Sequence, residues 1–598
     1  MAASNFKPKF ENLVDVYEHA VSSYAERPLF GTKVDGSWNW TTYADFQTHT
    51  EEIRGGLAAL GVGSDDVVGI IANNRAEWAV GAYATYGLAA RYVPMYESQL
   101  PKDWKYILAD SDTKVVFAAT AEIHGQLTAL KGELPKLEHI ICLDSSAGGD
   151  VLTYDKVREL GRDNPTEIAR PDGEHIAGFI YTSGTTGNPK GVLLSHRNLA
   201  SNVSAMHEVF PMAPEDRSLS FLPWAHSFGQ TVELHGLFSM GASMGIAESV
   251  PQIINNLAEV RPTLLFSVPR IFNKIHDGVL KKVEAGGGIK KKLFFATIEA
   301  ARTKKALAEQ KKSSGFVDLK HRILDGLVAS KIRDRFGGRL KYAFSGGAAI
   351  SKEVAEFIDA LGITVYEGYG LTETSPIATA NWPGARKIGS VGKPIPGVRV
   401  EIDRKVTGDP KHGEIIIFGH NVMQGYHGLP EENDKVFVEG GGFRTGDMGF
   451  VDDSGFLSIT GRIKEQYKLE NGKYVVPSPL EELLQISPFI NQAFVFGDNK
   501  PFNVAMVVPD LASLEKWAGE NGVSGSLESW LDNDKVLALY REQLDSFSGE
   551  FKQFEKVKKF KLIPEEFSIE NGLLTPKMSV KRRKVIERYQ DVLDGLYR

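Results

Sequence analysis

The pattern of apolar and polar residues in the first half of the chain switches repeatedly between two periods. Residues Thr41–Leu60 place apolar side chains at helical spacing and stop at Gly61, a residue that often follows a helix. The next run, Asp66–Ala72, is almost continuously apolar, which is typical of a strand buried on both faces. Further strand-like runs are His175–Thr182, Thr263–Val268 and Leu340–Phe344. Strands that alternate with helices predict largely parallel α/β sheets.

The pattern of apolar and polar residues changes in the second half of the sequence. Residues Ser351–Leu361 still predict a helix, with Ser351 as its N-cap. From about residue 389 short alternating runs such as Val398–Ile402 and Glu414–Phe418 lie between glycine turns, which favours a β-rich subdomain at 389–461. A shorter α+β unit with a basic end follows at 462–598.

Composition narrows the class of protein. The chain has 598 residues, of which 42% are hydrophobic and 24% charged, with a net charge of −7. This is the composition of a multidomain globular protein, and it gives no reason to expect nucleic acid as a partner. The single cysteine, Cys142, excludes an intrachain disulfide and a four-cysteine zinc site, and its apolar surroundings indicate a packing role. Because no apolar signal core and no run of roughly 18 apolar residues is present, we expect a cytosolic protein, with possible contact at the membrane surface.

One segment departs from this average. Residues 281–312 hold ten Lys/Arg and three Asp/Glu around the apolar cluster Leu293-Phe294-Phe295. A solvated helix face explains this pattern, and contact with anionic lipid head groups is the alternative.

The stretch Tyr181–Gly191 carries the clearest chemistry. Its glycines permit unusual backbone shapes, while its hydroxyls and Lys190 suit the binding of phosphate oxygens. It does not match the Walker pattern, because Gly187 is not followed by Lys and Ser/Thr. No G-x-G-x-x-G follows a strand either, which disfavours a dinucleotide site. The candidate phosphate-binding residues are Thr182, Ser183, Gly184, Thr185, Thr186, Gly187 and Lys190.

This loop resembles that of the adenylate-forming superfamily of acyl-CoA synthetases, luciferases and peptide-synthetase adenylation domains. Five further segments resemble motifs of the superfamily, in its order and at its spacing. They are Pro223–Phe228, Ser345–Ala349, Tyr366–Thr374, Arg444–Asp447 and Gly461–Glu465. The resemblance covers essentially the whole chain. It implies an α/β fold with a large N-terminal domain (1–461), made of two parallel-rich sheet subdomains and the β-rich one, and a small mobile C-terminal domain (462–598).

The resemblance also assigns roles in binding ATP and Mg²⁺. Thr372 would contact the α-phosphate, Glu373 would hold Mg²⁺ together with Thr185, and His226 would close over the substrate carboxylate. His235 is nearby in sequence, but a metal role for it lacks a third ligand. The residues assigned to adenine and ribose are Gly346, Gly347, Ala348, Glu367, Gly368, Tyr369, Gly370, Asp447 and Arg462.

The C-terminal unit carries the hinge and one departure. Lys464 matches the hinge residue, and Gly472, Lys473 and Tyr474 match the loop that lines the coenzyme A tunnel. Long-chain members of the superfamily carry a catalytic lysine where this chain has Ser579. Lys577 and Lys581 stand two residues to either side, and in a strand either would keep the same face.

Three features resemble long-chain fatty acyl-CoA synthetases: the basic insertion before Ser345, the stretch Arg261–Arg270, and Gly-Leu-Leu-Thr-Pro near the end. The resemblance therefore implies a ligase that uses ATP, Mg²⁺ and coenzyme A to activate a long-chain fatty acid. Two alternatives remain open at this point. One is an acyl-AMP ligase that serves a carrier protein, and the other is a non-catalytic acyl or nucleotide sensor at the membrane. The sequence does not indicate the oligomeric state.

Overall fold

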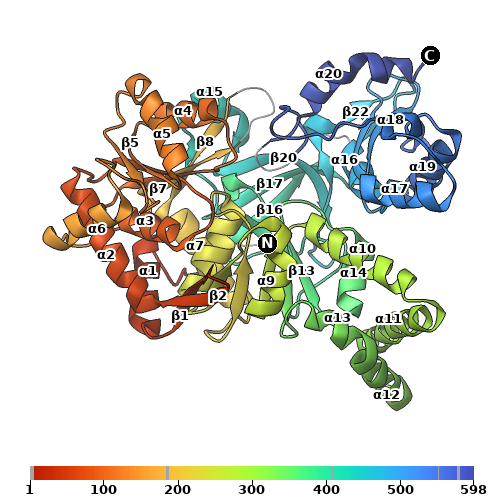
Figure 1. Ribbon diagram of the computed structural model, residues 1–598, viewed down its shortest axis with the longest axis horizontal. Helices are drawn as coiled ribbons and strands as arrows, with labels where there is room; N and C mark the ends of the chain where they lie inside the picture. The colour runs from red at the N-terminus through yellow and green to blue at the C-terminus, as the bar shows by residue number, and fades with distance from the viewer. Residues whose placement is uncertain (1–5, 183–187, 406–409, 550, 576–578) are drawn as a thin grey trace.

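The computed structural model describes residues 6–182, 188–405, 410–549, 551–575 and 579–598. Residues up to about 462, roughly three quarters of the chain, form a large body, and the C-terminal residues form a smaller α+β unit on one side of it (Figure 1). Cys142 lies at the end of the buried strand β6 (His139–Cys142), and it has no exposed surface, which agrees with the predicted packing role.

Two large sheets build the body, and the alternation of strands and helices predicts both. Within the described residues, one sheet has nine strands and the other has seven. The central strands of each sheet are parallel, and antiparallel pairs occur toward the edges. The nine-stranded sheet runs β15 (Lys393–Pro394), β14 (Ile377–Ala380), β13 (Thr364–Gly370), β12 (Tyr342–Ser345), β11 (Leu264–Ser267), β9 (Arg217–Ser220), β10 (Ser243–Ile246), β1 (Pro28–Val34), β2 (Ser37–Thr42). The seven-stranded sheet runs β18 (Gly425–Tyr426), β8 (Lys190–Ser195), β7 (Ile176–Thr182), β4 (Arg91–Met95), β3 (Val67–Ile71), β5 (Thr113–Ala118), β6.

Helices connect these strands, and their first turns follow the sequence signals. Thr42 caps the helix α2 (Tyr43–Ala59) in a capping box with Asp45, and Ser351 caps α14 (Lys352–Ala360) as predicted. The other helices of the body are α1 (Leu13–Tyr24), α3 (Ala76–Tyr86), α4 (Pro101–Asp110), α5 (Ala121–Leu130), α6 (Tyr154–Asp163), α7 (His196–Val209), α8 (Gly236–Ser239), α9 (Ile253–Val260), α10 (Pro269–Ala285), α11 (Gly288–Glu309), α12 (Gly315–Leu324), α13 (Ser330–Asp334) and α15 (Pro430–Val436). Among the described residues, no helix is both long and apolar enough to cross a bilayer.

A third, antiparallel sheet follows, as the glycine-separated short strands predict. Its path is β16 (Val398–Asp403), β17 (Gly413–Gly419), β20 (Gly442–Val451), β19 (Phe437–Val438), with β21 (Leu457–Arg462) paired to β20. The register of β20 and β21 places Asp447 directly opposite Arg462. The last residue of this sheet is therefore also the first residue of the predicted C-terminal unit.

The C-terminal unit has its own sheets and its own apolar core. Its elements are β22 (Tyr467–Lys468), β23 (Tyr474–Val475), α16 (Pro477–Leu484), β24 (Ile490–Phe496), β25 (Asn503–Pro509), α17 (Leu511–Glu520), α18 (Leu527–Trp530), α19 (Asp534–Phe547), β26 (Val557–Leu562) and α20 (Arg582–Gly595). It docks on the body through α16, where Leu483 and Ile486 pack against the apolar cluster beneath α10 and α14. Lys281 on α10 also donates a hydrogen bond to Ser513 on α17, at 2.8 Å.

The structure divides the apolar cluster at residues 293–295. Phe294 is 1% exposed and packs in the core beneath α14, whereas Phe295 is 49% exposed. Two nearby cations have acidic partners, since Lys305 pairs with Asp359 and Lys304 with Asp318. The solvated helix face and the contact with anionic lipid both stay predictions for residues 281–312.

A buried carboxyl group lies between the nine-stranded sheet and a π-helix at Phe228–His235. Glu233 on this helix is fully buried, and it accepts hydrogen bonds from Ser218 at 2.9 Å and Ser220 at 2.8 Å. Burial raises its pKa to about 8, and the two serine hydroxyls only partly oppose this rise. Glu233 is therefore protonated in the folded protein at neutral pH.

We expect Glu233→Gln to stabilise the protein at pH 8 and not at pH 5. An acid whose folded pKa is raised costs stability as pH climbs from its unfolded pKa, near 4.3, toward its folded pKa near 8. The uncharged amide removes this cost, so the melting temperature at pH 8 should rise by about 3 °C relative to the unmodified chain. The exposed Glu208→Gln serves as the control. A loss of stability that is equal at both pH values would contradict this account.

Candidate adenylate-binding site

The carboxyl ends of β12 and β13 form one rim of the candidate site. Ser345 ends β12, so Gly346, Gly347 and Ala348 leave the sheet directly beside β13. Open α/β sheets bind ligands at this edge, where loops leave the carboxyl ends of the strands. The hydroxyl of Ser345 is buried and has no hydrogen-bond partner among the described residues. An unpaired buried hydroxyl next to two glycines suits a polar planar ligand such as a nucleobase.

The segment that carries His226 lies against this rim. The hydroxyl of the neighbouring Ser227 is 3.3 Å from that of Thr372, which follows β13. A Cβ atom placed on Gly346 would lie 3.2 Å from the ring of Phe228. Phe228 begins the π-helix, a rare local structure that is common at functional sites. The structure therefore brings the segment at 226–228 against the loops at Gly346 and Thr372, which lie more than a hundred residues further along the chain.

A glycine is required where β13 turns into the loop that holds Thr372. A Cβ atom at Gly370 would come within 1.7 Å of the carbonyl oxygen of Pro376, so no larger residue fits there. The loop that follows is thereby pressed against the end of the strand.

Asp447 joins three parts of the chain at a second rim. Its carboxylate accepts a hydrogen bond from the Tyr369 hydroxyl at 2.7 Å and forms a salt bridge with Arg462 at 3.1 Å. Burial raises the pKa of Asp447, while the Arg462 guanidinium and the Tyr369 hydroxyl oppose that rise. Tyr369 is itself 9% exposed. These are the residues that the resemblance assigns to adenine and ribose, and they are in direct contact.

The third rim comes from the seven-stranded sheet. Lys190 is the register partner of Thr182, at the two ends of the hairpin that encloses the candidate phosphate loop. Ser183, Gly184, Thr185, Thr186 and Gly187 themselves lie outside the described residues. The ammonium group of Lys190 pairs with Glu432, and it also lies 5.0 Å from the centre of the Tyr426 ring.

Tyr426 links this rim to Glu373. Its hydroxyl donates a hydrogen bond of 2.8 Å to the Glu373 carboxylate. Burial and the neighbouring carboxylate both raise the pKa of Tyr426, so the hydroxyl keeps its proton and remains a donor. The Glu373 carboxylate is half-buried and lies one residue from Thr372. A single positioned carboxylate near phosphate-binding groups fits Mg²⁺, which prefers one or two carboxylates together with phosphate oxygens.

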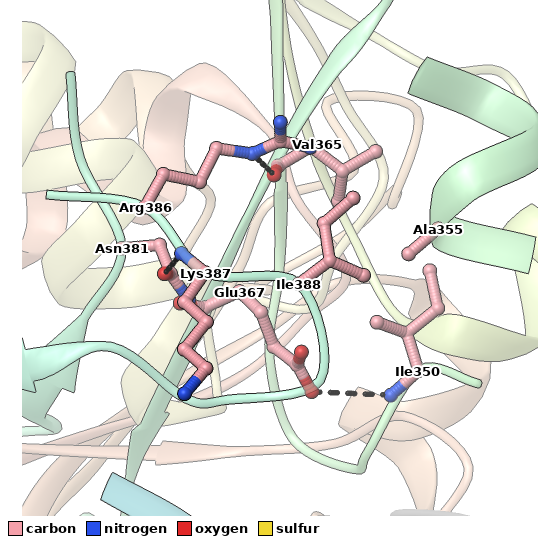
Figure 2. A pocket seen from close by; sticks show the side chains of 8 residues that line it. All are labelled: Ile350, Ala355, Val365, Glu367, Asn381, Arg386, Lys387 and Ile388. Carbon is pink, nitrogen blue, oxygen red and sulfur yellow. Dashed lines mark hydrogen bonds between the residues drawn. The ribbon is translucent and has the colours of Figure 1, made fainter. Parts of the chain in front are cut away.

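Glu367 lies apart from these contacts. Its carboxylate accepts a hydrogen bond from the backbone N–H of Ile350 at 3.3 Å (Figure 2). The side chain lines a small hollow of about 10 Å³, room for about one water, with Arg386 and Lys387 on its wall. Burial and the carboxylate of Glu482 raise the pKa of Glu367 to about 8. Gly368, between Glu367 and Tyr369, pairs with Ala380 of β14.

The candidate coenzyme A residues lie on the C-terminal unit. Gly472 occupies the turn of the β22–β23 hairpin with a φ of +82°, and Lys473 and Tyr474 follow it, both exposed. Lys473 lies over the ring of Phe554, inside the same unit, at 4.7 Å. Lys464 is exposed in a short 3₁₀ turn directly after β21. The described contact of Lys473 thus lies within the C-terminal unit, whereas Lys464 is two residues from Arg462 of the Asp447 cluster.

Ser579 lies outside the strands of the structure. The Thr575 N–H donates to the Ser579 carbonyl at 2.8 Å, and Leu574 and Val580 form an isolated β-bridge. Lys581 is the residue immediately before α20. The assignment of Lys577 or Lys581 stays a prediction. Lys577 lies outside the described residues.

Sequence reasoning misses several contributors to the site. Tyr426 and Glu432 hold Glu373 and Lys190, but neither belongs to a recognisable motif, and only the pairing of β18 with β8 brings them near. Ser227 is adjacent to the predicted His226, and this proximity is the sequence signal that could have found it.

His235 is buried and hydrogen-bonded to the Tyr83 hydroxyl at 2.8 Å. Burial lowers its pKa to about 3, so it stays neutral in the core.

Comparison with solved structures finds this fold elsewhere. The adenylation domain of a carboxylate reductase from Mycobacterium chelonae matches with a TM-score of 0.78 and 22% identity over 99% of this chain and 92% of that one. An anthranilate CoA ligase in complex with anthranoyl-AMP matches with a TM-score of 0.74 and 20% identity over 99% of each chain.

Sequence comparison gives full-length relatives. The chain is 32% identical to the peroxisomal long chain acyl-CoA synthetase 6 of Arabidopsis thaliana, over 99% of this chain and 87% of that protein. It is 31% identical to a long-chain-fatty-acid–CoA ligase of Mycobacterium bovis, over 97% and 96%. The AMP-binding enzyme family model matches residues 17–427, and the C-terminal domain model of AMP-binding enzymes matches residues 464–598. The chain therefore belongs to the family of AMP-binding enzymes.

Proposed function

We propose that this protein is an AMP-forming long-chain fatty acid–CoA ligase, which converts ATP, a fatty acid and coenzyme A into acyl-CoA, AMP and diphosphate. The observation that carries the proposal is that three groups meet at the carboxyl end of β13: the segment of His226 and Ser227, the loop that holds Thr372, and the Asp447 cluster, which is joined to β13 through Tyr369. Relatives named as long-chain acyl-CoA synthetases, similar over nearly the whole chain, support the substrate class.

The proposed reaction has two steps. In the first, a fatty acid carboxylate oxygen attacks the α-phosphorus of ATP, and diphosphate leaves. Both reactants are anionic, so the site must offset their negative charge and hold the attacking and leaving oxygens in line with the phosphorus. Catalysis of this step would therefore be electrostatic and positional. Thr372 would contact the α-phosphate, Lys190 the departing phosphates, and His226 the carboxylate. Mg²⁺ bound near Glu373 would supply further positive charge at the phosphates.

In the second step, the thiol of coenzyme A attacks the carbonyl carbon of the acyl-adenylate, and AMP leaves. We propose that residues 462–598 act as a mobile lid that turns at Lys464 and brings the hairpin at Gly472–Tyr474 to the site. The exposed hinge residue and the separate core of this unit support that motion. The enzyme would work in the cytosol, at the face of a membrane that supplies its substrate.

The proposal predicts the products of one incubation. With ATP, Mg²⁺ and acids from acetate to about C20, mass spectrometry should find acyl-CoA and AMP, with a maximum at about C12–C18. Omission of coenzyme A should leave acyl-adenylate on the enzyme. Acyl-adenylate that never becomes acyl-CoA would point to a carrier protein as acceptor. If no acid yields an adenylate, the proposed ligase activity is wrong.

We expect Tyr426→Phe to lower kcat/KM for adenylation by about 10- to 100-fold. The change removes one hydrogen bond to the charged Glu373, a loss of about 1.5–3 kcal/mol in carboxylate positioning. The concentration of Mg²⁺ that gives half-maximal activity should rise as well. Tyr540→Phe is the matched control, since its hydroxyl bonds to the Phe489 backbone within the C-terminal unit. Unchanged Mg²⁺ dependence in Tyr426→Phe would show that Tyr426 does not position Glu373.

We also propose that Lys577 supplies the charge that other long-chain enzymes place at the position of Ser579. Lys577→Ala should slow adenylation by at least about 100-fold and leave the conversion of preformed acyl-adenylate to acyl-CoA within about threefold, because the lysine would act only on the first step. Lys581→Ala tests the other candidate lysine, which directly precedes α20. Similar small effects of both changes on both half-reactions would reject the assignment.

A further inference from the structure

An exposed apolar stripe runs along α12, one of two helices that project from the body. The helices α11 and α12 extend away from the body at one corner of the molecule (Figure 1). Four large apolar side chains on α12 and the π-helical turn that follows it face solvent. They are Phe316 (77% exposed), Leu319 (55%), Ile323 (53%) and Leu327 (51%). Their spacing of three, four and four residues places them on a single helical face.

The orientation of this stripe is fixed by what lies behind it. Leu324 and Ala329 are buried, and Val328 and Ile332 pack against the core beneath α14. The helix therefore already uses its other face for packing, and the four exposed residues form a second apolar face. A contiguous exposed apolar patch of this kind marks an interaction site, whereas isolated apolar residues do not.

The charge around the stripe is strongly positive. Residues 281–335 hold fifteen Lys/Arg and six Asp/Glu, a net charge of +9 in a chain whose net charge is −7. Lys320 is exposed within the stripe, four residues after Phe316 and three before Ile323, and Lys331 is exposed one turn beyond Leu327. Two acidic residues of this region already have basic partners. Asp318 of α12 pairs with Lys304 of α11, and Asp325 pairs with Arg333.

We propose that this stripe is a membrane-docking surface that binds the interface of an anionic lipid bilayer. The four apolar side chains would enter the acyl boundary, while Lys320 and Lys331 would extend to the phosphate head groups. This arrangement is typical of helices that lie on a bilayer without crossing it. A second copy of the chain fits the surface less well, because the two basic surfaces would repel each other. The segment thus differs from the cluster at 293–295, where Phe294 belongs to the core.

Vesicle co-sedimentation of the full chain tests the proposal. We expect binding to vesicles of phosphatidylcholine with about 30% phosphatidylglycerol, little binding to phosphatidylcholine alone, and a decrease as salt is raised. The double change Phe316→Ser/Ile323→Ser should weaken binding at least about tenfold. Each lysine near the membrane surface should contribute about fivefold to vesicle binding. The double change Lys320→Glu/Lys331→Glu should therefore weaken vesicle binding about 25-fold or more. Neither ATP nor an acid is needed, so the result is independent of the proposed ligase activity.

Matched controls distinguish this surface from the general effect of removing any exposed apolar side chain or reversing any exposed charge. Ile254→Ser removes a similarly exposed apolar side chain on α9, and Lys102→Glu reverses an exposed charge on α4. Both controls should bind vesicles as the unmodified chain does, and all variants should keep its far-ultraviolet circular dichroism. Equal binding by the stripe variants and the controls would overturn the proposal. So would an unmodified chain that ignores anionic vesicles, or stripe variants that only convert a dimer into a monomer in sedimentation velocity.

Discussion

The buried carboxylate of Asp447 is the interaction on which the site depends. A carboxylate removed from water is costly unless hydrogen bonds and an opposite charge compensate it. Here the compensation comes from Tyr369 at the end of β13 and from Arg462 at the end of β21. The two partners belong to different sheets, so satisfying this one charge fixes the antiparallel sheet against the nine-stranded sheet. It also anchors the first residue of the proposed lid.

The same logic extends to the neighbouring rim. Glu373 is held by Tyr426, whose ring also receives the ammonium group of Lys190. β18 is a two-residue edge strand, yet its pairing with β8 brings Tyr426 from the seven-stranded sheet to the loop after β13. At both of these rims a polar contact thus joins two sheets. A ligand that spans the rims, as an adenylate would, contacts all three sheets at once.

Local sequence patterns predict the helices and strands well. The tertiary contacts of the site are predicted only by the resemblance to a family. The capping box at Thr42 and the cap at Ser351 are encoded within four residues, and the alternating strands after residue 389 show their period directly. Asp447 and Arg462 become neighbours through strand register, which a sequence pattern does not specify. Tyr426 has no local signature at all. The choice between Lys577 and Lys581 beside Ser579 likewise has no local signature in the sequence.

The most direct test of the account is a crystal structure of the protein with a non-hydrolysable long-chain acyl-adenylate analogue. The account predicts ribose hydroxyls within hydrogen-bonding distance of Asp447, the adenine between Tyr369 and the segment Gly346–Ala348, and the acyl carbonyl beside His226. An analogue that lies elsewhere, or that leaves Asp447 without a ribose contact, would contradict the claim that this junction is the adenylate site.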